Sequence, residues 1–406
     1  MITDPETLKS LMTEGSLLPQ EEMLAVAKKK GKLVIGIPKE TSYQENRVAL
    51  IPETVQLLVN NGHQVLVESK AGEKLHYTDN DYSEAGAEIT YDTAEVFKSN
   101  IILKVAPPKQ DEIDMMPGNQ TLISALQLTL QPKETLLALM QKRITAVAWD
   151  YIKDDHGIFP VVRTMGEIAG NTAILIAAEL LSNYQNGKGI MMGGIAGVQP
   201  TEVVILGAGT VGEYATRSAI GLGASVKVFD NSLSKLRRLQ NDIGQRVYTS
   251  IIQPKLLEKA IKRADVIIGA IRAPFGRTPC IVTEAMVAQM KPNSVIVDIS
   301  IDQGGCFETS RVTNHQNPTF KKHDIIHYCV PNIASRVSRT ASIALSNIFS
   351  PMMLDMGNNG GCKEMIKRDP GFRSGVYIYK GKLTSQLLGE VFDLPYKDIE
   401  LLLAAL

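Results

Sequence analysis

A glycine-rich turn between an apolar strand and a helix constrains this chain more than any other feature. The sequence Glu202-Val-Val-Ile-Leu-Gly-Ala-Gly-Thr-Val-Gly predicts a strand, a turn with glycines at Gly207, Gly209 and Gly212, and a following amphipathic helix. In such a turn the first glycine makes the tight bend and the second lets a pyrophosphate approach the backbone. The third lets the helix pack closely on the strand, and the helix N-terminus attracts the phosphates. The stretch therefore predicts a dinucleotide site.

An acidic residue closes the next predicted strand. Asp230 follows the strand Ser225–Phe229, at the distance from the glycine turn that is typical of dinucleotide-binding units. A carboxylate there can accept hydrogen bonds from a ribose diol, and it would repel the 2′-phosphate of NADP. The sequence therefore predicts NAD as the cofactor. The alternative is a glycine-rich turn in a sheet that binds no nucleotide.

Composition and charge narrow the class of protein. The 406 residues are 44% hydrophobic, and 43 Lys and Arg balance 43 Asp and Glu, so no overall field attracts nucleic acid or an acidic membrane. No apolar run is long enough to span a bilayer, and the N-terminal sequence does not resemble a signal peptide. Four cysteines without CxxC spacing fit reduced thiols. We therefore expect a cytoplasmic protein of about two domains that has no nucleic-acid or membrane partner.

Strands and helices alternate along the chain, which predicts an α/β fold with doubly wound parallel sheets. We expect a helical extension at residues 1–30 and a substrate domain at 31–160 plus 339–406. A Rossmann domain that binds NAD, at 161–338, would be inserted into the substrate domain. Long helices, expected over Thr164–Tyr184 and Arg339–Met356, would connect the two domains.

Short apolar runs between turn signals give the expected strands. In the first domain these strands are Leu33–Ile37, Gln64–Glu68, Ile101–Val105, Thr121–Ala125 and Ile144–Trp149. After the glycine turn they are Ser225–Phe229, Asp265–Ala270, Ser294–Ile299 and Ile325–Val330, with a helix expected over Val282–Met290. A leucine-rich helix is expected over Tyr396–Leu406.

Polar side chains follow three predicted strands at their carboxyl ends, where α/β domains place their sites. Arg47 lies in the loop after the first strand, Lys104 ends an apolar run, and Asp302 lies beside two glycines. A guanidinium can clamp a carboxylate, and a lysine near the end of a buried strand can polarise a carbonyl or exchange a proton. A carboxylate that faces a nicotinamide can stabilise an iminium or orient a water.

Each of these residues also has a structural interpretation. Arg47 could form a salt bridge with Glu45, Lys104 could extend its apolar stem toward solvent, and Asp302 could cap a turn. None of the six histidines has metal-ligand spacing, and His327-Tyr-Cys329 lies on a predicted strand that is more typical of the core. We therefore assign no metal.

Several segments resemble one family. Ile35-Gly-Ile-Pro-Lys-Glu, Glu45-Asn-Arg-Val-Ala-Leu and Met191-Met-Gly-Gly-Ile-Ala-Gly-Val resemble alanine dehydrogenases and the NAD(H)-binding component of proton-translocating transhydrogenase. The similarity covers about residues 33–350, and Ile301-Asp-Gln-Gly-Gly-Cys is most similar to the alanine dehydrogenase branch. The resemblance implies two Rossmann-like domains flanking a cleft and a homohexamer. It also implies an oxidoreductase of amino-acid metabolism that interconverts pyruvate and alanine with NAD.

The resemblance also implies roles for substrate-facing residues. Arg47 would hold the substrate carboxylate, and Lys104 would hold its carbonyl or amino group. Asp302 would act in catalysis beside the nicotinamide, with Asn332 lining the same cleft. Lys104 and Asp302 are therefore the expected catalytic residues, and Lys104 would take the acid/base role.

A second group would contact the cofactor. The resemblance places Met165 and Ile299 near the nicotinamide and Lys235 near the adenosine ribose. A serine that the family carries near the pyrophosphate is Gly166 here. That change removes one hydrogen bond, worth on the order of 1 kcal/mol, and should leave NAD binding intact.

One substrate-facing position departs from the family pattern. Alanine dehydrogenases carry a histidine where this chain has Gln127, which can hydrogen-bond a substrate but cannot change protonation near pH 7. The reaction could then use another acid/base, be slow, or take a different 2-oxo or 2-amino acid. Two alternatives therefore stay open. One is a transhydrogenase-like NAD(H)-binding component or sensor with little turnover, and the other is a dehydrogenase for a larger substrate such as a lysine-derived opine.

Overall fold

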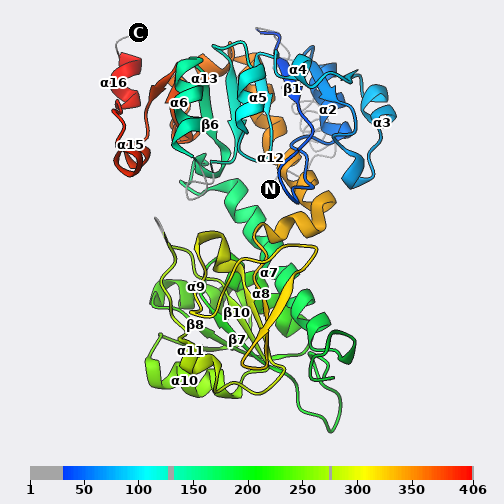
Figure 1. The fold of residues 1–406 in the computed structure, drawn as a ribbon, viewed down its shortest axis with the longest axis vertical. Coiled ribbons are helices and arrows are strands. Elements are labelled where there is room, and N and C mark those ends of the chain that lie inside the picture. Colours follow the sequence, from blue (N-terminus) through cyan, green and yellow to red (C-terminus); the bar gives the residue numbers. More distant parts are fainter. Residues whose placement is uncertain (1–30, 127–131, 274–276, 405–406) are drawn as a thin grey trace, which may run out of the picture. The chain divides into compact units, whose positions relative to one another are not determined.

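The computed structural model describes residues 31–126, 132–273 and 277–404, which form two α/β units (Figure 1). Unit 1 holds the described residues up to Glu40, Val48–Phe159, and the described residues from Ser342 onward. Unit 2 holds Thr41–Arg47 and Pro160–Ala341. Unit 2, which contains the glycine turn, is thus inserted into unit 1 along the chain, as the fold prediction has it. The short segment Thr41–Arg47, which the predicted boundaries place in the substrate domain, groups with unit 2.

Unit 1 is built on an eight-stranded sheet in the order β15-β14-β6-β5-β4-β1-β2-β3. The strands β1 to β6 run parallel and read 3-2-1-4-5-6 from one edge, which is the Rossmann order. The order reverses between β1 and β4, so the loops after these two strands diverge to opposite sides of the sheet. Their bounds are β1 Val34–Ile37, β2 Gln64–Glu68, β3 Glu88–Thr90, β4 Ile101–Leu103, β5 Thr121–Ser124 and β6 Thr145–Ala148.

An antiparallel edge completes this sheet. The strand β14 (Val376–Tyr379) pairs with β6, and β15 (Lys382–Leu383) pairs with β14, both antiparallel. The predicted parallel sheet is thus confirmed for β1 to β6, and the antiparallel edge is an addition that the sequence analysis did not include. These strands come from the end of the chain, and strand periodicity along the sequence does not indicate which sheet a late strand joins.

The helices of unit 1 flank its sheet. Early ones follow the predicted pattern: α2 begins at a proline, and α3 begins with a capping box from Thr78 and Asp81. The helices of this unit are α2 Pro52–Asn60, α3 Asp79–Glu84, α4 Thr93–Val96, α5 Gln110–Met115, α6 Lys133–Gln141, α13 Cys362–Arg368, α14 Pro370–Arg373, α15 Gln386–Phe392 and α16 Ile399–Ala404. Short 3₁₀ turns lie at η1 Glu73–Leu75 and η2 Trp149–Tyr151.

Unit 2 repeats the same strand order. Its seven-stranded sheet reads β12-β13-β11-β10-β7-β8-β9, and all pairs are parallel except that of β12 with β13. The order reverses between β7 and β10. The strands are β7 Glu202–Leu206, β8 Ser225–Phe229, β9 Tyr248–Ser250, β10 Val266–Gly269, β11 Val295–Asp298, β12 Thr319–Lys322 and β13 Ile325–Tyr328.

Two closely packed helices cover one region of this sheet. The helix α7 (Pro160–Leu180) crosses α8 (Thr210–Gly221) at Gly170, where any side chain would strike the Val211 carbonyl. The other helices are α9 Leu233–Ile243, α10 Pro254–Arg263 and α11 Glu284–Val287, with 3₁₀ segments η3 Asn183–Gln185, η4 Ile299–Gln303 and η5 Ile333–Val337. The helix expected over Val282–Met290 is thus much shorter, because Val282 makes a β-bridge with Phe307 and Thr283 caps the helix.

The long helix α12 (Ser338–Asn358) returns the chain to unit 1. Two buried serines on it bind the backbone that precedes α2: the Ser342 hydroxyl accepts the N–H of Val48, and the Ser346 hydroxyl accepts that of Ile51, both at 2.9 Å. A buried N–H without a partner costs free energy, so these hydroxyls hold α12 against the segment that precedes α2. Within the described residues, no helix has the length and apolar character that crossing a membrane would need.

Replacing one of these serines tests the anchor. In Ser346→Ala the buried N–H of Ile51 loses its partner, so we expect the free energy of unfolding to fall by about 1–3 kcal/mol. The neighbouring Asn347 is exposed on the same helix, and Asn347→Ala is the matched control. Urea unfolding measures both variants, and equal stability of the two would contradict the anchor.

Candidate functional site

Two of the three glycines in the turn of unit 2 are tightly packed, and the third borders open space. A side chain at Gly207, whose φ is +110°, would strike the Ala270 carbonyl, and one at Gly212 would strike the carbonyl of Gly207. A Cβ at Gly209, by contrast, would meet no atom within 4 Å. This open space lies at the N-terminus of α8, where backbone N–H groups favour phosphates. The turn therefore fits a dinucleotide pyrophosphate.

Asp230 is fixed beside this turn. Its carboxylate accepts the N–H of Ala208 and the N–H of Ser232, both at 2.7 Å. The guanidinium of Arg238 donates to the Ala208 carbonyl at 3.2 Å, which brings a cation that the sequence analysis missed to the same turn. Lys235 lies exposed on the first turn of α9, and its backbone N–H donates to the Ser232 hydroxyl. Its predicted contact with a ribose stays a prediction.

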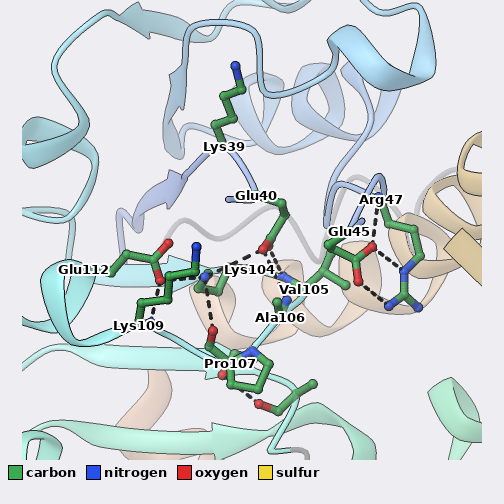
Figure 2. A network of polar contacts seen from close by, with 12 residues as sticks. Lys39, Glu40, Glu45, Arg47, Lys104, Val105, Ala106, Pro107, Lys109 and Glu112 are labelled. Carbon is green, nitrogen blue, oxygen red and sulfur yellow. Dashed lines mark hydrogen bonds and ion pairs between the residues drawn. The ribbon is translucent and has the colours of Figure 1, made fainter. Parts of the chain in front are cut away.

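Arg47 forms a buried, two-pronged ion pair with Glu45 (Figure 2). The guanidinium donates from Nε to Oε1 at 2.8 Å and from Nη2 to Oε2 at 2.7 Å. Burial alone would raise the pKa of Glu45, but Arg47 outweighs it and holds that pKa below the usual value. The structural alternative weighed for Arg47 is thus realised. Arg47 Nη1 also lies 3.3 Å from the Met165 sulfur, so these two predicted site residues lie in contact.

Asn332 extends this pair to Asp302. The Asn332 side chain donates to Glu45 Oε2 at 2.7 Å, and its backbone N–H donates to Asp302 Oδ1 at 3.0 Å. Asn332 adopts a left-handed conformation, with φ +55°, which an asparagine tolerates well. Glu45 therefore links Arg47 to Asn332, and the backbone of Asn332 links them to Asp302. We call these four residues of unit 2 the Arg47–Asp302 network. Asp302 keeps an exposed surface, yet desolvation by the surrounding protein still raises the pKa of its carboxyl.

Side-chain and backbone contacts hold the segment Thr41–Arg47 on unit 2. The Ser335 hydroxyl in η5 accepts the N–H of Asn46 at 2.9 Å and donates to the Gln44 carbonyl at 2.8 Å. The Gln44 side chain accepts the N–H of His315 at 2.6 Å. These contacts explain why Arg47 belongs with Asp302 even though it follows β1 of unit 1 in the sequence.

Lys104 is completely buried in unit 1, directly after β4 (Figure 2). Its ammonium lies 2.8 Å from Glu112 Oε2 and 3.7 Å from Glu40 Oε2, and it donates to the Pro107 carbonyl at 3.4 Å. Desolvation would lower the pKa of Lys104, but the two carboxylates outweigh it and raise that pKa. The lysine is therefore a fixed cation, and the alternative in which it extends toward solvent is wrong.

One of the two carboxylates comes from the loop after β1, and the other comes from the helix α5. Glu40 follows β1 and accepts the N–H of Val105 at 2.5 Å, so it links the loops after β1 and β4. Glu112 lies on α5 and also accepts the N–H of Lys109 at 2.9 Å. The sequence analysis did not assign a role to either, although Glu40 is part of the Ile35-Gly-Ile-Pro-Lys-Glu motif.

The remaining residues considered in the sequence analysis lie outside the Arg47–Asp302 network and the Lys104 cluster. Ile299 begins η4, where it packs against the core of unit 2. Gln127 lies outside the described residues. His327 is buried between Thr309 and the Ile325 carbonyl, and burial lowers its pKa to about 4, so it is a neutral core residue. No group of metal-ligating side chains occurs in the described part of the chain.

Comparison with known proteins identifies the family. The model of the alanine dehydrogenase/PNT N-terminal domain matches residues 36–169, and that of the C-terminal domain matches residues 173–386. The chain belongs to the alanine dehydrogenase/PNT family. The resemblance predicted from the sequence motifs is thereby confirmed.

Relatives and solved structures agree with this assignment. The chain is 39% identical over 373 residues to an alanine dehydrogenase of Mycolicibacterium smegmatis, which covers 92% of this chain and 100% of the relative. It is 39% identical over 370 residues to one of Methanococcus maripaludis, covering 91% and 99%. A solved L-alanine dehydrogenase superposes with a TM-score of 0.84 at 35% identity and covers 89% of this chain and 99% of that one. A transhydrogenase from Sinorhizobium meliloti shares the fold, with a TM-score of 0.73 at 24% identity, covering 87% and 99%.

A buried carboxyl that the sequence analysis missed precedes the loop of Asp302. Asp298 ends β11, and its Oδ2 accepts the Ser310 hydroxyl at 2.6 Å and the N–H of Cys306 at 3.1 Å. Burial raises the pKa of Asp298 from 3.8 to about 6, although these hydrogen bonds oppose the shift. These two contacts connect the end of β11 to residues that follow the segment carrying Asp302.

This raised pKa predicts a pH-dependent stability. The folded state favours the protonated carboxyl of Asp298. Its contribution to the free energy of unfolding is therefore complete below about pH 4 and is lost as the pH rises through about 6. Asp298→Asn cannot lose a proton. The free energy of unfolding of the variant minus that of the wild type should therefore increase by on the order of 2–3 kcal/mol between about pH 4 and about pH 7. The exposed Asp324→Asn is the control, and a pH-independent difference for Asp298→Asn would refute the prediction.

Proposed function

We propose that this chain is an NAD-dependent alanine dehydrogenase. It would convert L-alanine, NAD and water to pyruvate, ammonium and NADH. The observation that carries the proposal is the Arg47–Asp302 network: a guanidinium that can bind a carboxylate and a carboxyl that can move a proton share the unit that carries the glycine turn. The relatives of similar length, all alanine dehydrogenases, support the same substrate.

The cofactor proposal rests on the glycine turn and Asp230. Bound NAD would supply the hydride acceptor for the substrate Cα. The backbone around Gly209 would hold the pyrophosphate, and Asp230 would accept hydrogen bonds from the ribose diol. Met165 and Ile299 would pack near the nicotinamide, and Lys235 near the adenosine ribose.

Substrate binding would divide among four residues. Arg47, oriented by Glu45, would bind the substrate carboxylate, and Asn332 and Gln127 would add hydrogen bonds. Lys104 would polarise the carbonyl oxygen. Because two carboxylates keep Lys104 charged, we now propose it as a hydrogen-bond donor rather than as the acid/base. Proton transfer to and from the attacking water would then fall to Asp302, whose raised pKa suits it to carry a proton.

Location and assembly are further proposals. The four free cysteines support a cytoplasmic enzyme, and the family resemblance supports a homohexamer. Exposed apolar side chains at Met191, Ile195 and Val198, on the loop before β7, support association of subunits. Light scattering tests the assembly, and a monomer would argue against it.

A substrate panel tests the reaction. We expect NADH absorbance to fall with pyruvate plus ammonium, and to fall more slowly with 2-oxo acids that carry larger side chains. Lys104→Gln should reduce kcat/KM for pyruvate by roughly a hundredfold or more, because the carbonyl loses its charged donor. The binding of NADH, followed by fluorescence, should survive this substitution.

The exposed Lys98 provides the matched control, since Lys98→Gln removes a charge from the same unit. Circular dichroism establishes that both variants fold. If Lys104→Gln keeps most of the wild-type activity, the role of the lysine is wrong. If the wild type reduces no 2-oxo acid at any pH, a nucleotide-binding component with little turnover replaces the proposed enzyme.

Cofactor choice can be tested separately. NAD(H) should bind well ahead of NADP(H), because the Asp230 carboxylate would repel a 2′-phosphate. Asp230→Ala should weaken NADH binding by roughly tenfold and narrow the difference between the two cofactors. Fluorescence titration measures all four dissociation constants, and equal affinities of the wild type for NADH and NADPH would sink the claim.

A further inference from the structure

Unit 1 contains a cavity of about 250 Å³ that the proposed reaction does not use. Thr121 and Thr145, the first residues of β5 and β6, line it, and so does Tyr379 at the end of the antiparallel β14. Lys104, by contrast, follows the carboxyl end of β4. Because β4, β5 and β6 are parallel, the cavity lies at the opposite edge of the sheet from Lys104.

The charged side chains that line this cavity all have the same sign. Arg143 comes from the turn after α6, Lys363 from α13, and Lys380 from the turn between β14 and β15. No carboxylate belongs to the lining formed by the described residues. Glu364, which follows Lys363, pairs instead with Lys367 at 3.2 Å. These three residues are exposed, so solvent screens their mutual repulsion, but together they give the cavity a positive potential that favours a bound anion.

Two of these cations occupy backbone positions that favour glycine. Arg143 has φ +56° and Lys380 has φ +48°, and Asn119, which also lines the cavity, has φ +58°. Arg143 directly follows the C-cap of α6, where glycine is the usual residue. These left-handed turns fix the backbone positions from which Arg143 and Lys380 reach the lining of the cavity.

The cavity also has a polar lining. The Tyr379 residue is 3% exposed, and its hydroxyl has no hydrogen-bond partner among the described residues. Buried hydroxyls are usually paired, so this one is suited to a ligand atom that enters the cavity. The neighbouring Thr145 hydroxyl accepts the N–H of Lys380 at 3.3 Å, which fixes Lys380 at the mouth.

We propose that this cavity binds a small, multiply charged anion, either a phosphate ester or a di- or tricarboxylate. Arg143 can bind either class through two parallel hydrogen bonds, and the lysines add compact positive charges. The modest volume admits a small metabolite and excludes an entire dinucleotide. The site is separate from the glycine turn, which belongs to unit 2.

Calorimetry on the full chain tests the proposal, with pyrophosphate and citrate as probes of the two anion classes. The titrations are run at constant ionic strength and in the presence of saturating NADH, so that the glycine turn does not contribute. We expect at least one probe to bind. Arg143→Gln should weaken that binding by roughly tenfold or more, and Tyr379→Phe by several-fold. The control is Lys382→Gln, which removes an exposed charge from β15 outside the cavity lining and should bind like the wild type.

Cysteine alkylation gives a second readout that is independent of the nucleotide site. Cys362 lines the cavity, whereas Cys280 is exposed on unit 2 and serves as the internal reference. A bound anion should slow the reaction of iodoacetamide with Cys362 and leave that with Cys280 unchanged, as followed by mass spectrometry. Protection by pyrophosphate alone or by citrate alone identifies the anion class. Absence of binding and of protection with both probes, or equal binding by Arg143→Gln and the wild type, would overturn the proposal.

Discussion

The reversal of strand order at the centre of each sheet is the constraint on which the rest of this structure depends. In unit 1 the chain turns to opposite sides after β1 and β4, and in unit 2 after β7 and β10. At such a point the carboxyl ends of two parallel strands leave a crevice that loops do not fill. Lys104 and Glu40 lie at the first reversal, and the glycine turn lies at the second. The site residues therefore collect where the strand order leaves room for ligands.

Carboxylates compensate the buried charges of both Lys104 and Arg47. Lys104 has two carboxylates, and Arg47 has Glu45 on two of its nitrogens. An unpaired buried charge would cost several kcal/mol, so these partners are needed before any ligand is considered. They also fix the orientation of the groups that would meet a substrate. The same pairing keeps the Lys104 ammonium charged, and this is why the proposed mechanism assigns proton transfer to Asp302.

Local signals predicted the strand, turn and helix at the start of the unit 2 sheet well, whereas contacts between distant residues limited the prediction elsewhere. The glycines and Asp230 lie within thirty residues of one another, so strand, turn and helix patterns define them. Glu45 lies two residues before Arg47 in the sequence, so their ion pair could be considered from the sequence alone. Glu112 as the partner of Lys104, and the return of β14 to the edge of unit 1, depend on contacts that periodicity does not encode.

Isotope labelling can follow the hydride that we propose passes between NADH and the substrate Cα. The enzyme would be incubated with pyruvate, ammonium and NADH that carries deuterium at nicotinamide C4, prepared as each of the two stereoisomers. We expect one isomer to yield alanine with deuterium at Cα, in an amount equal to the NADH consumed. Deuterated lactate as the product, or alanine without deuterium from both isomers, would refute alanine dehydrogenase activity.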